Sequence, residues 1–141
     1  MFLLDTDHIG ILQRKTDSHY EKLASRISRY SQTEFYVAIV SFHEQILGWN
    51  TYIHRAKDQA GVVRGYTKLD KILGDFSRAQ VLPFDDAAAE IFDELRSQKI
   101  RIGTMDLRIA SIAMATGMTV LSRNLVDFQK VPNLSVEDWA S

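Results

Sequence analysis

The sequence contains no cysteine and only four histidines among its 141 residues. Without cysteine there can be no disulfide bridge, no thiolate zinc site and no cysteine nucleophile. The scarcity of histidine also makes zinc an unsuitable metal. No apolar run reaches the roughly 18 residues of a membrane span, and the short apolar start, MFLLDTD, has no basic region before it. We therefore expect a cytoplasmic protein without a signal peptide or membrane segment.

An excess of charge of either sign is also missing. Lys and Arg number 17 against 18 Asp and Glu, so the formal net charge is -1. Such a chain has no global attraction to polyanions, and any affinity for nucleic acid must come from a local basic patch or from a metal ion. A length of 141 residues with 45% hydrophobic residues fits one domain, residues 1–141, with a substantial core.

Short apolar runs alternate with amphipathic segments along the chain. The runs predict strands at 2–4, 36–40, 81–84 and 118–121, and a further edge strand at 134–136. Apolar positions at helical spacing predict the helices between them, including a helical hairpin over about 41–77 with its turn near 58–61. This alternation predicts a three-layer α/β/α domain with a central parallel sheet of four to five strands.

Several single residues mark the ends of the predicted helices. Asp17 is placed to cap the second helix, and Asp85 or Asp86 is placed to cap the helix after the third strand. Ser41 and Glu44 form the S-x-x-E signature of a capping box. Gly117 follows the most apolar helix and is a suitable end for it.

The most informative stretch runs from residue 100 to 128 and contains GTMDLRIASIAMATG, then MTVLSRN and LVDF. A helix so apolar around its circumference is expected to be buried. Asp106 lies in its first turn and therefore at the rim of the core, where a carboxylate needs a partner.

Four carboxylates follow predicted strands or begin the helices after them. They are Asp5, Glu44, Asp106 and Asp127. In parallel α/β sheets, ligand sites lie beyond the carboxyl ends of the strands, so we expect these four side chains to meet.

Each acid also has a purely local interpretation. Asp5 or Asp7 can cap the first helix, and Glu44 can close the capping box. Asp106 can complement the helix dipole behind a cap at Thr104, and Asp127 can simply be solvated. These interpretations account for the acids singly but not for their shared position.

Together, four carboxylates at one edge would repel one another and raise their pKa values unless a cation lay among them. Mg²⁺, with Mn²⁺ as an alternative, prefers oxygen ligands and is commonly held by a few carboxylates, with waters and substrate phosphate completing its shell. Such a site suits phosphodiester hydrolysis, in which the metal activates a water and stabilises developing charge. The sequence leaves open whether one or two ions bind.

The succession LLDTD, SFHEQILG, GTMDLRIASIA, TVLSRNLVDF and VPNLSVEDW resembles the PIN-domain ribonucleases, and most closely the VapC toxins of type II toxin-antitoxin systems. The resemblance covers essentially the whole chain and is strongest over residues 1–7 and 102–139. It implies a metal-dependent endoribonuclease in which Asp5, Glu44 and Asp106 are the characteristic catalytic and metal-binding acids.

The resemblance leaves the fourth acidic position open between Asn124 and Asp127. Because an amide is a weaker ligand for a hard cation and cannot act as a base, we predict that Asp127 fills it and that Asn124 orients Asp127 or the phosphate. Thr6 and Thr104 match positions that usually support the site in the family.

By the same resemblance, the substrate is RNA, the product carries a 5′-phosphate, the protein is a homodimer and a cognate antitoxin blocks the site. Arg108 and Arg123 lie close in sequence to the proposed acids and are candidates for contacts with the RNA backbone. His8 and His43 are also neighbours of these acids, but we expect them to point elsewhere on their helices. The particular RNA and antitoxin remain unidentified.

Two other functions are compatible with parts of the sequence. LLDTD also suits a phosphatase of the haloacid-dehalogenase type, with Asp5 as nucleophile and Asp7 as acid and base. That family requires a glycine directly after D-x-D, where this chain has His8, and a later G-D-x-x-x-D stretch, which is absent. The second alternative is a catalytically silent PIN-like module that acts by binding protein or RNA.

Overall fold

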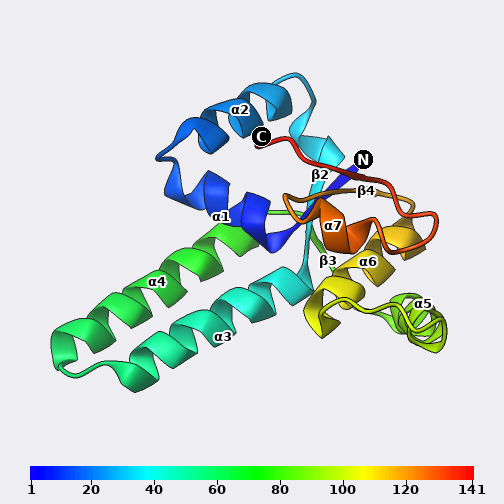
Figure 1. Cartoon of the computed structure of the whole chain (residues 1–141). Helices are drawn as coiled ribbons and strands as arrows, with labels where there is room; N and C mark the ends of the chain where they lie inside the picture. Colours follow the sequence, from blue (N-terminus) through cyan, green and yellow to red (C-terminus); the bar gives the residue numbers. More distant parts are fainter.

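The computed structural model describes every residue from Met1 to Ser141, and its helices and strands alternate along the chain (Figure 1). The strands are β1 (Phe2–Leu4), β2 (Phe35–Ala38), β3 (Val81–Leu82), β4 (Thr119–Leu121) and β5 (Val136–Glu137). The helices are α1 (Thr6–Arg14), α2 (Ser18–Ile27), α3 (Ile39–Arg55), α4 (Gln59–Ser77), α5 (Asp86–Ser97), α6 (Thr104–Thr116) and α7 (Leu125–Phe128). One 3-10 turn, Gln32–Glu34, precedes β2.

The five strands form one sheet in the order β3-β2-β1-β4-β5, and every neighbouring pair is parallel. Leu3 and Val120 face a core cluster that includes α5 and α6, whereas Leu4 and Leu121 face another that includes α1, α2 and α4. The sheet is therefore covered on both faces, as continuous apolar runs predict. The predicted three-layer α/β/α architecture is confirmed.

Helices α3 and α4 form a long hairpin that projects to one side of the domain (Figure 1). Asp58 caps α4 by accepting a hydrogen bond from the backbone N–H of Gly61 (2.9 Å). The helices approach closely at Gly65, where an added Cβ would clash with Cγ1 of Ile53. The predicted hairpin is confirmed, although it begins at Ile39 rather than at residue 41.

Three predicted helix boundaries are confirmed by their local contacts. Asp17 accepts a hydrogen bond from the Tyr20 N–H (3.1 Å), and Asp85 accepts one from the Ala88 N–H (3.0 Å). Gly117 ends α6 with a φ of 68°, in the left-handed region that glycine adopts without strain. In each case residues close in sequence make the whole contact.

The predicted capping box of Ser41 and Glu44 is wrong. Helix α3 begins at Ile39 after Ala38, which makes no side-chain cap, so Ser41 lies inside the first turn. Its hydroxyl is fully buried and faces Thr6 instead of the helix backbone. Thr104 is likewise not a cap, because it is the first helical residue of α6 and Gly103 precedes it. In both helices the chain turns helical earlier than the capping pattern predicts.

β1 matches its predicted range, whereas the other four strands are shorter than or shifted from the predicted runs. β2 ends at Ala38 rather than at residue 40, and β3 ends at Leu82, before Pro83, which has no N–H to donate to a neighbouring strand. β5 lies at Val136–Glu137 instead of 134–136. None of the helices combines the length and apolar character required to cross a bilayer.

Candidate active site

Asp5 occupies the carboxyl end of the central strand β1 and caps α1. Its Oδ1 accepts a hydrogen bond from the Thr6 N–H (2.7 Å), and its Oδ2 accepts one from the Ser122 hydroxyl (2.8 Å). Only 5% of the residue is exposed. The pKa of Asp5 is raised to about 7, chiefly by burial and also by the charges of Asp7 and Asp106, while the two hydrogen bonds oppose the shift. Two interpretations offered by the sequence, a helix cap and a member of an acidic site, therefore both apply to this residue.

Glu44 reaches the same edge from α3. Thr6 Oγ1 donates a hydrogen bond to Oε1 of Glu44 (2.8 Å) and lies 2.9 Å from Oγ of the buried Ser41. Thr6 follows Asp5 directly, so this contact ties the start of α1 to the first turns of α3. The structure thus places the predicted supporting residue Thr6 between two of the predicted acids.

Asp106 lies in the first turn of α6 and is half-buried. Burial raises the pKa of Asp106, and the negative charges of Glu44 and Asp127 raise it further. A hydrogen bond from Asn124 Nδ2 to Oδ2 of Asp106 (3.3 Å) opposes the increase. These mutual effects show that residues far apart in sequence share one electrostatic site.

Asn124 and Asp127 both face Asp106. Asn124 Nδ2 donates to Oδ2 of Asp127 (3.0 Å) as well as to Asp106, so the amide bridges the two carboxylates. Hydrogen bonds from Asn124 and from Lys130 Nζ (3.3 Å) hold the pKa of Asp127 below its usual value. The geometry matches an orienting role for Asn124, whereas the assignment of Asp127 as the fourth acid stays a prediction.

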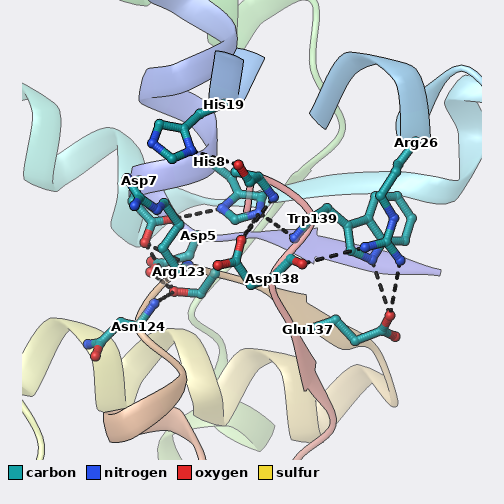
Figure 2. A network of polar contacts seen from close by, with 12 residues as sticks. Asp5, Asp7, His8, His19, Arg26, Arg123, Asn124, Glu137, Asp138 and Trp139 are labelled. Atoms are coloured by element: carbon teal, nitrogen blue, oxygen red, sulfur yellow. Dashed lines mark hydrogen bonds and ion pairs between the residues drawn. The ribbon is translucent and has the colours of Figure 1, made fainter. Parts of the chain in front are cut away.

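Two residues of this site, Asp7 and Ser122, were not among the acids and supporting residues predicted for the nuclease site; Asp7 is labelled in Figure 2. Asp7 Oδ2 accepts hydrogen bonds from the Arg123 N–H (3.0 Å) and from the Ser122 hydroxyl (3.2 Å), which also donates to Asp5. The one hydroxyl of Ser122 thus lies between two carboxylates. The D-T-D spacing was the available signal for Asp7, but nothing local marks Ser122.

Other candidate residues lie less close to the acids. Arg108 places its guanidinium over the Phe92 ring, 5.8 Å from the centroid, so it packs against α5. Arg123 has an exposed side chain, and its only contact with the acids is through its backbone N–H. Thr104 and His43 are exposed. RNA contacts by the two arginines and a supporting role for Thr104 remain predictions.

The donor set of this site is chemically suited to a hard divalent cation. The five acids of the site, Asp5, Glu44, Asp106, Asp127 and Asp7, offer only oxygen ligands. The pKa values of Asp5 and Asp106 are raised, which means that no positive charge compensates their ionised forms. No three His, Asp or Glu side chains converge tightly enough to enclose an ion by themselves. A cation here would therefore be held by fewer direct carboxylates together with water, as Mg²⁺ commonly is.

Fold and site together define a parallel α/β domain with an acidic cluster at the carboxyl edge of its sheet. No family model matches the chain. It is 31% identical over 139 residues to Ribonuclease VapC of Rickettsia bellii, covering 95% of this chain and 92% of that protein. It is 28% identical over 143 residues to the tRNA(fMet)-specific endonuclease VapC of Salmonella typhimurium, covering 98% and 97%.

Among solved structures, VapBC2 from Rickettsia felis bound to a DNA fragment from their promoter matches with a TM-score of 0.69 and 25% identity, covering 98% of each chain. The chain therefore belongs to the VapC family of PIN-domain ribonuclease toxins. The predicted family is confirmed, and the haloacid-dehalogenase alternative loses its support.

Proposed function

We propose that this protein is a Mg²⁺-dependent endoribonuclease toxin that hydrolyses RNA phosphodiester bonds at the Asp5, Glu44, Asp106 and Asp127 cluster. When bound, the ion would supply an activated water and stabilise charge on the phosphate. Mn²⁺ fits the same oxygen donors. By family resemblance the product would carry a 5′-phosphate.

Each acid has a distinct environment that suits a distinct task. Asp5 and Asp106, whose pKa values are raised by burial, gain most from a cation and would hold it. Glu44 is oriented by the Thr6 hydroxyl, and Asp127 is oriented by Asn124. The last two carboxylates would help to hold the ion or would orient a water for attack on the phosphate.

One observation carries this proposal: four acids from different elements act on one another electrostatically. Asp5 follows β1, Glu44 and Asp106 lie in the first turns of α3 and α6, and Asp127 lies in α7. Glu44 and Asp127 each raise the pKa of Asp106, and Asp106 in turn raises that of Asp5. A protein gains no stability from such repulsion, so the cluster is best explained by a bound cation and by function.

A groove beside the cluster offers a path for RNA. It has a volume of about 550 Å³, lies between α1 and the α3–α4 hairpin, and begins at Thr6. Arg14, Lys68 and Lys71 line the groove and can contact phosphates. Lys71 also forms an ion pair with Asp75, with its Nζ 4.0 Å from Oδ2. The groove provides the local basic patch that a chain of net charge -1 needs for binding RNA.

The family relationship also supports a protein partner. The solved VapBC2 complex supports a cognate antitoxin for this chain, and resemblance to the family supports a homodimer. Helix α4 exposes three large apolar side chains, Val63, Tyr66 and Leu73, each about 60% accessible, which suit a protein interface.

The test is cleavage of 5′-labelled RNAs, a tRNA(fMet) among them, by the purified chain with Mg²⁺ and with EDTA. We expect Mg²⁺-dependent products from the parent and none from Asp5→Asn. Asp93→Asn makes the same charge change at an exposed position on α5 and should cleave like the parent. Absence of cleavage by the parent across several RNAs, with RNA or antitoxin binding retained, would favour the silent binding module.

A further inference from the structure

The last residues of the chain are fixed against the body of the domain. Trp139 is 1% exposed and stacks within an aromatic cluster, with its ring centroid 4.7 Å from that of Phe2. The Arg26 guanidinium lies over the same indole at 4.6 Å, and His19 Nδ1 donates to the carbonyl oxygen of Ala140 (2.7 Å). The segment therefore packs against the body of the domain through several side-chain contacts (Figure 2).

His8 connects this segment to the acidic site. It is fully buried, and its Nε2 accepts a hydrogen bond from the backbone N–H of Trp139 (3.3 Å). Nδ1 must then carry the ring proton, and it donates to Oδ1 of Asp7 (2.8 Å). Both ring nitrogens are occupied, so the tail fixes the tautomer and the orientation in which the ring meets Asp7.

Asp7 also makes hydrogen bonds to the loop after β4, residues 122–124. Its other oxygen accepts the Arg123 N–H (3.0 Å) and the Ser122 hydroxyl (3.2 Å). Ser122 Oγ also accepts the Asn124 N–H (2.9 Å), and Asn124 reaches Asp106. A displacement of the Asp7 carboxylate would therefore move a loop that contacts three other acids of the site, Asp5, Asp106 and Asp127.

We propose that His8 is a positioning residue of the active site, which fixes the Asp7 carboxylate and, through it, the loop of residues 122–124. The competing role for a buried histidine is to fill the core between α1 and the tail. The kinetic part of the inference rests on the proposed ribonuclease function, whereas the ordering of the loop does not.

Two substitutions separate the contacts of the ring. In His8→Gln, the side-chain amide reaches the position of Nε2 and can accept from Trp139, but Asp7 loses its donor. In His8→Asn, the amide lies at the position of Nδ1 and can donate to Asp7, but the contact with the tail is lost. Both variants replace the buried ring by a smaller side chain, and Asn is one methylene shorter than Gln. A core-filling role therefore predicts a loss in His8→Asn at least as large as in His8→Gln. His19→Ala is the control, because it removes a tail contact that does not touch Asp7.

We expect His8→Gln to lower kcat on RNA by about 10- to 100-fold, the usual effect of losing a partner that orients a site carboxylate, with KM changed by less than about threefold. His8→Asn should recover most of that rate, and His19→Ala should match the parent. A loss of kcat in His8→Asn equal to or larger than that in His8→Gln would overturn the proposal in favour of core filling. A parental kcat in His8→Gln would also overturn it.

Hydrogen exchange provides a readout that does not require cleavage. Exchange at the Arg123 N–H should be faster in His8→Gln than in the parent, His8→Asn and His19→Ala, because that N–H is held by Asp7. ¹⁵N NMR of the parent should show the Nδ1–H tautomer for His8. If the parent cleaves no RNA, the ribonuclease function fails, while exchange at Arg123 still decides the positioning role; parental exchange there in His8→Gln would overturn it.

Discussion

Replacing Asp5 by Asn should stabilise the metal-free protein and the gain should depend on pH. The pKa of Asp5 is raised from 3.8 to about 7, so between these values the folded protein retains a proton that the unfolded chain has released. Stability from this residue is therefore lost as the pH rises from about 4 to about 7, and it stays lost above that range. The difference of about 3 between the two pKa values corresponds to a loss of roughly 4 kcal/mol at most in the free energy of unfolding.

The substitution conserves the hydrogen bonds around Asp5. An asparagine Oδ1 can still accept the Thr6 N–H, since Asn caps helices as well as Asp does. Its amide N–H can donate to Ser122 Oγ, whose hydroxyl can then donate fully to Asp7. We therefore expect the free energy of unfolding of Asp5→Asn to exceed that of the parent by about 1–3 kcal/mol at pH 8 and by little at pH 4.5. The gain at pH 8 is below the maximum because the parent relaxes part of its electrostatic penalty.

Thermal melting in EDTA, measured from pH 4.5 to 8, checks this reasoning. For a chain of this length, each kcal/mol should move the melting temperature by roughly 3–4 °C. Added Mg²⁺ should then stabilise the parent, which binds it in the folded state, and leave the variant almost unchanged. A variant that melts below the parent at pH 8 would mean that Asp5 serves the fold as a cap, and the electrostatic account would be refuted.

Three further predictions concern the other residues of the site. Asp106→Asn should abolish Mg²⁺-dependent RNA cleavage while far-UV circular dichroism and melting stay near parental, since removing a carboxylate relieves repulsion; a molten or unfolded variant would contradict this. Glu44→Gln should also lose cleavage but change the unfolding free energy in urea by less than about 0.5 kcal/mol, because Glu44 caps no helix; a larger loss would reinstate the capping box. The double variant Arg14→Ala, Lys68→Ala should have a KM raised by roughly 3- to 10-fold at constant kcat, and its KM should depend less on salt concentration. An equal effect of Lys22→Ala, at an exposed position outside the groove, would show that the groove has no specific role in binding RNA.

The parts of the fold that the sequence predicts well are those decided locally. Asp17, Asp85 and Gly117 act on backbone groups within four residues, so their roles could be read from spacing alone. The apolar strand runs also sufficed to predict a sheet covered on both faces. The strand ends were less accurate, because a strand continues only where a neighbouring strand provides partners, as at Leu82 before Pro83.

The capping box failed for a tertiary reason. Ser41 and Glu44 have the spacing of a cap, yet both side chains face Thr6, which comes from the start of α1. The same sequence signature thus serves a contact between two helices instead of a contact within one. A pattern of four residues cannot distinguish these outcomes, because the competing partner is more than 30 residues away in the chain.

The positions of the acids could be predicted because parallel strands end at one edge, but their supporting contacts could not. Ser122 and Asp7 meet only because β4 lies beside β1, an order that strand periodicity does not reveal. His8 was expected to point away from the four predicted acids, and it makes no hydrogen bond to any of them. Its contact with Asp7 was not predicted, because it forms where residues 138–140 pack against the ring.

The sheet order explains why the N-terminal strand is the centre of the site. β1 has β2 on one side and β4 on the other, so the turn after it receives Glu44 from the β2 side and Ser122 from the β4 side. Thr6 and Asp5 each take one of these contacts and are adjacent in sequence. A shift of β1 by one residue would exchange Leu3 and Leu4 between the two core clusters, because successive residues point to opposite faces, and it would move Asp5 and Thr6 away from these partners. The register Leu4 to Leu121 therefore specifies the active site as strictly as it specifies the core.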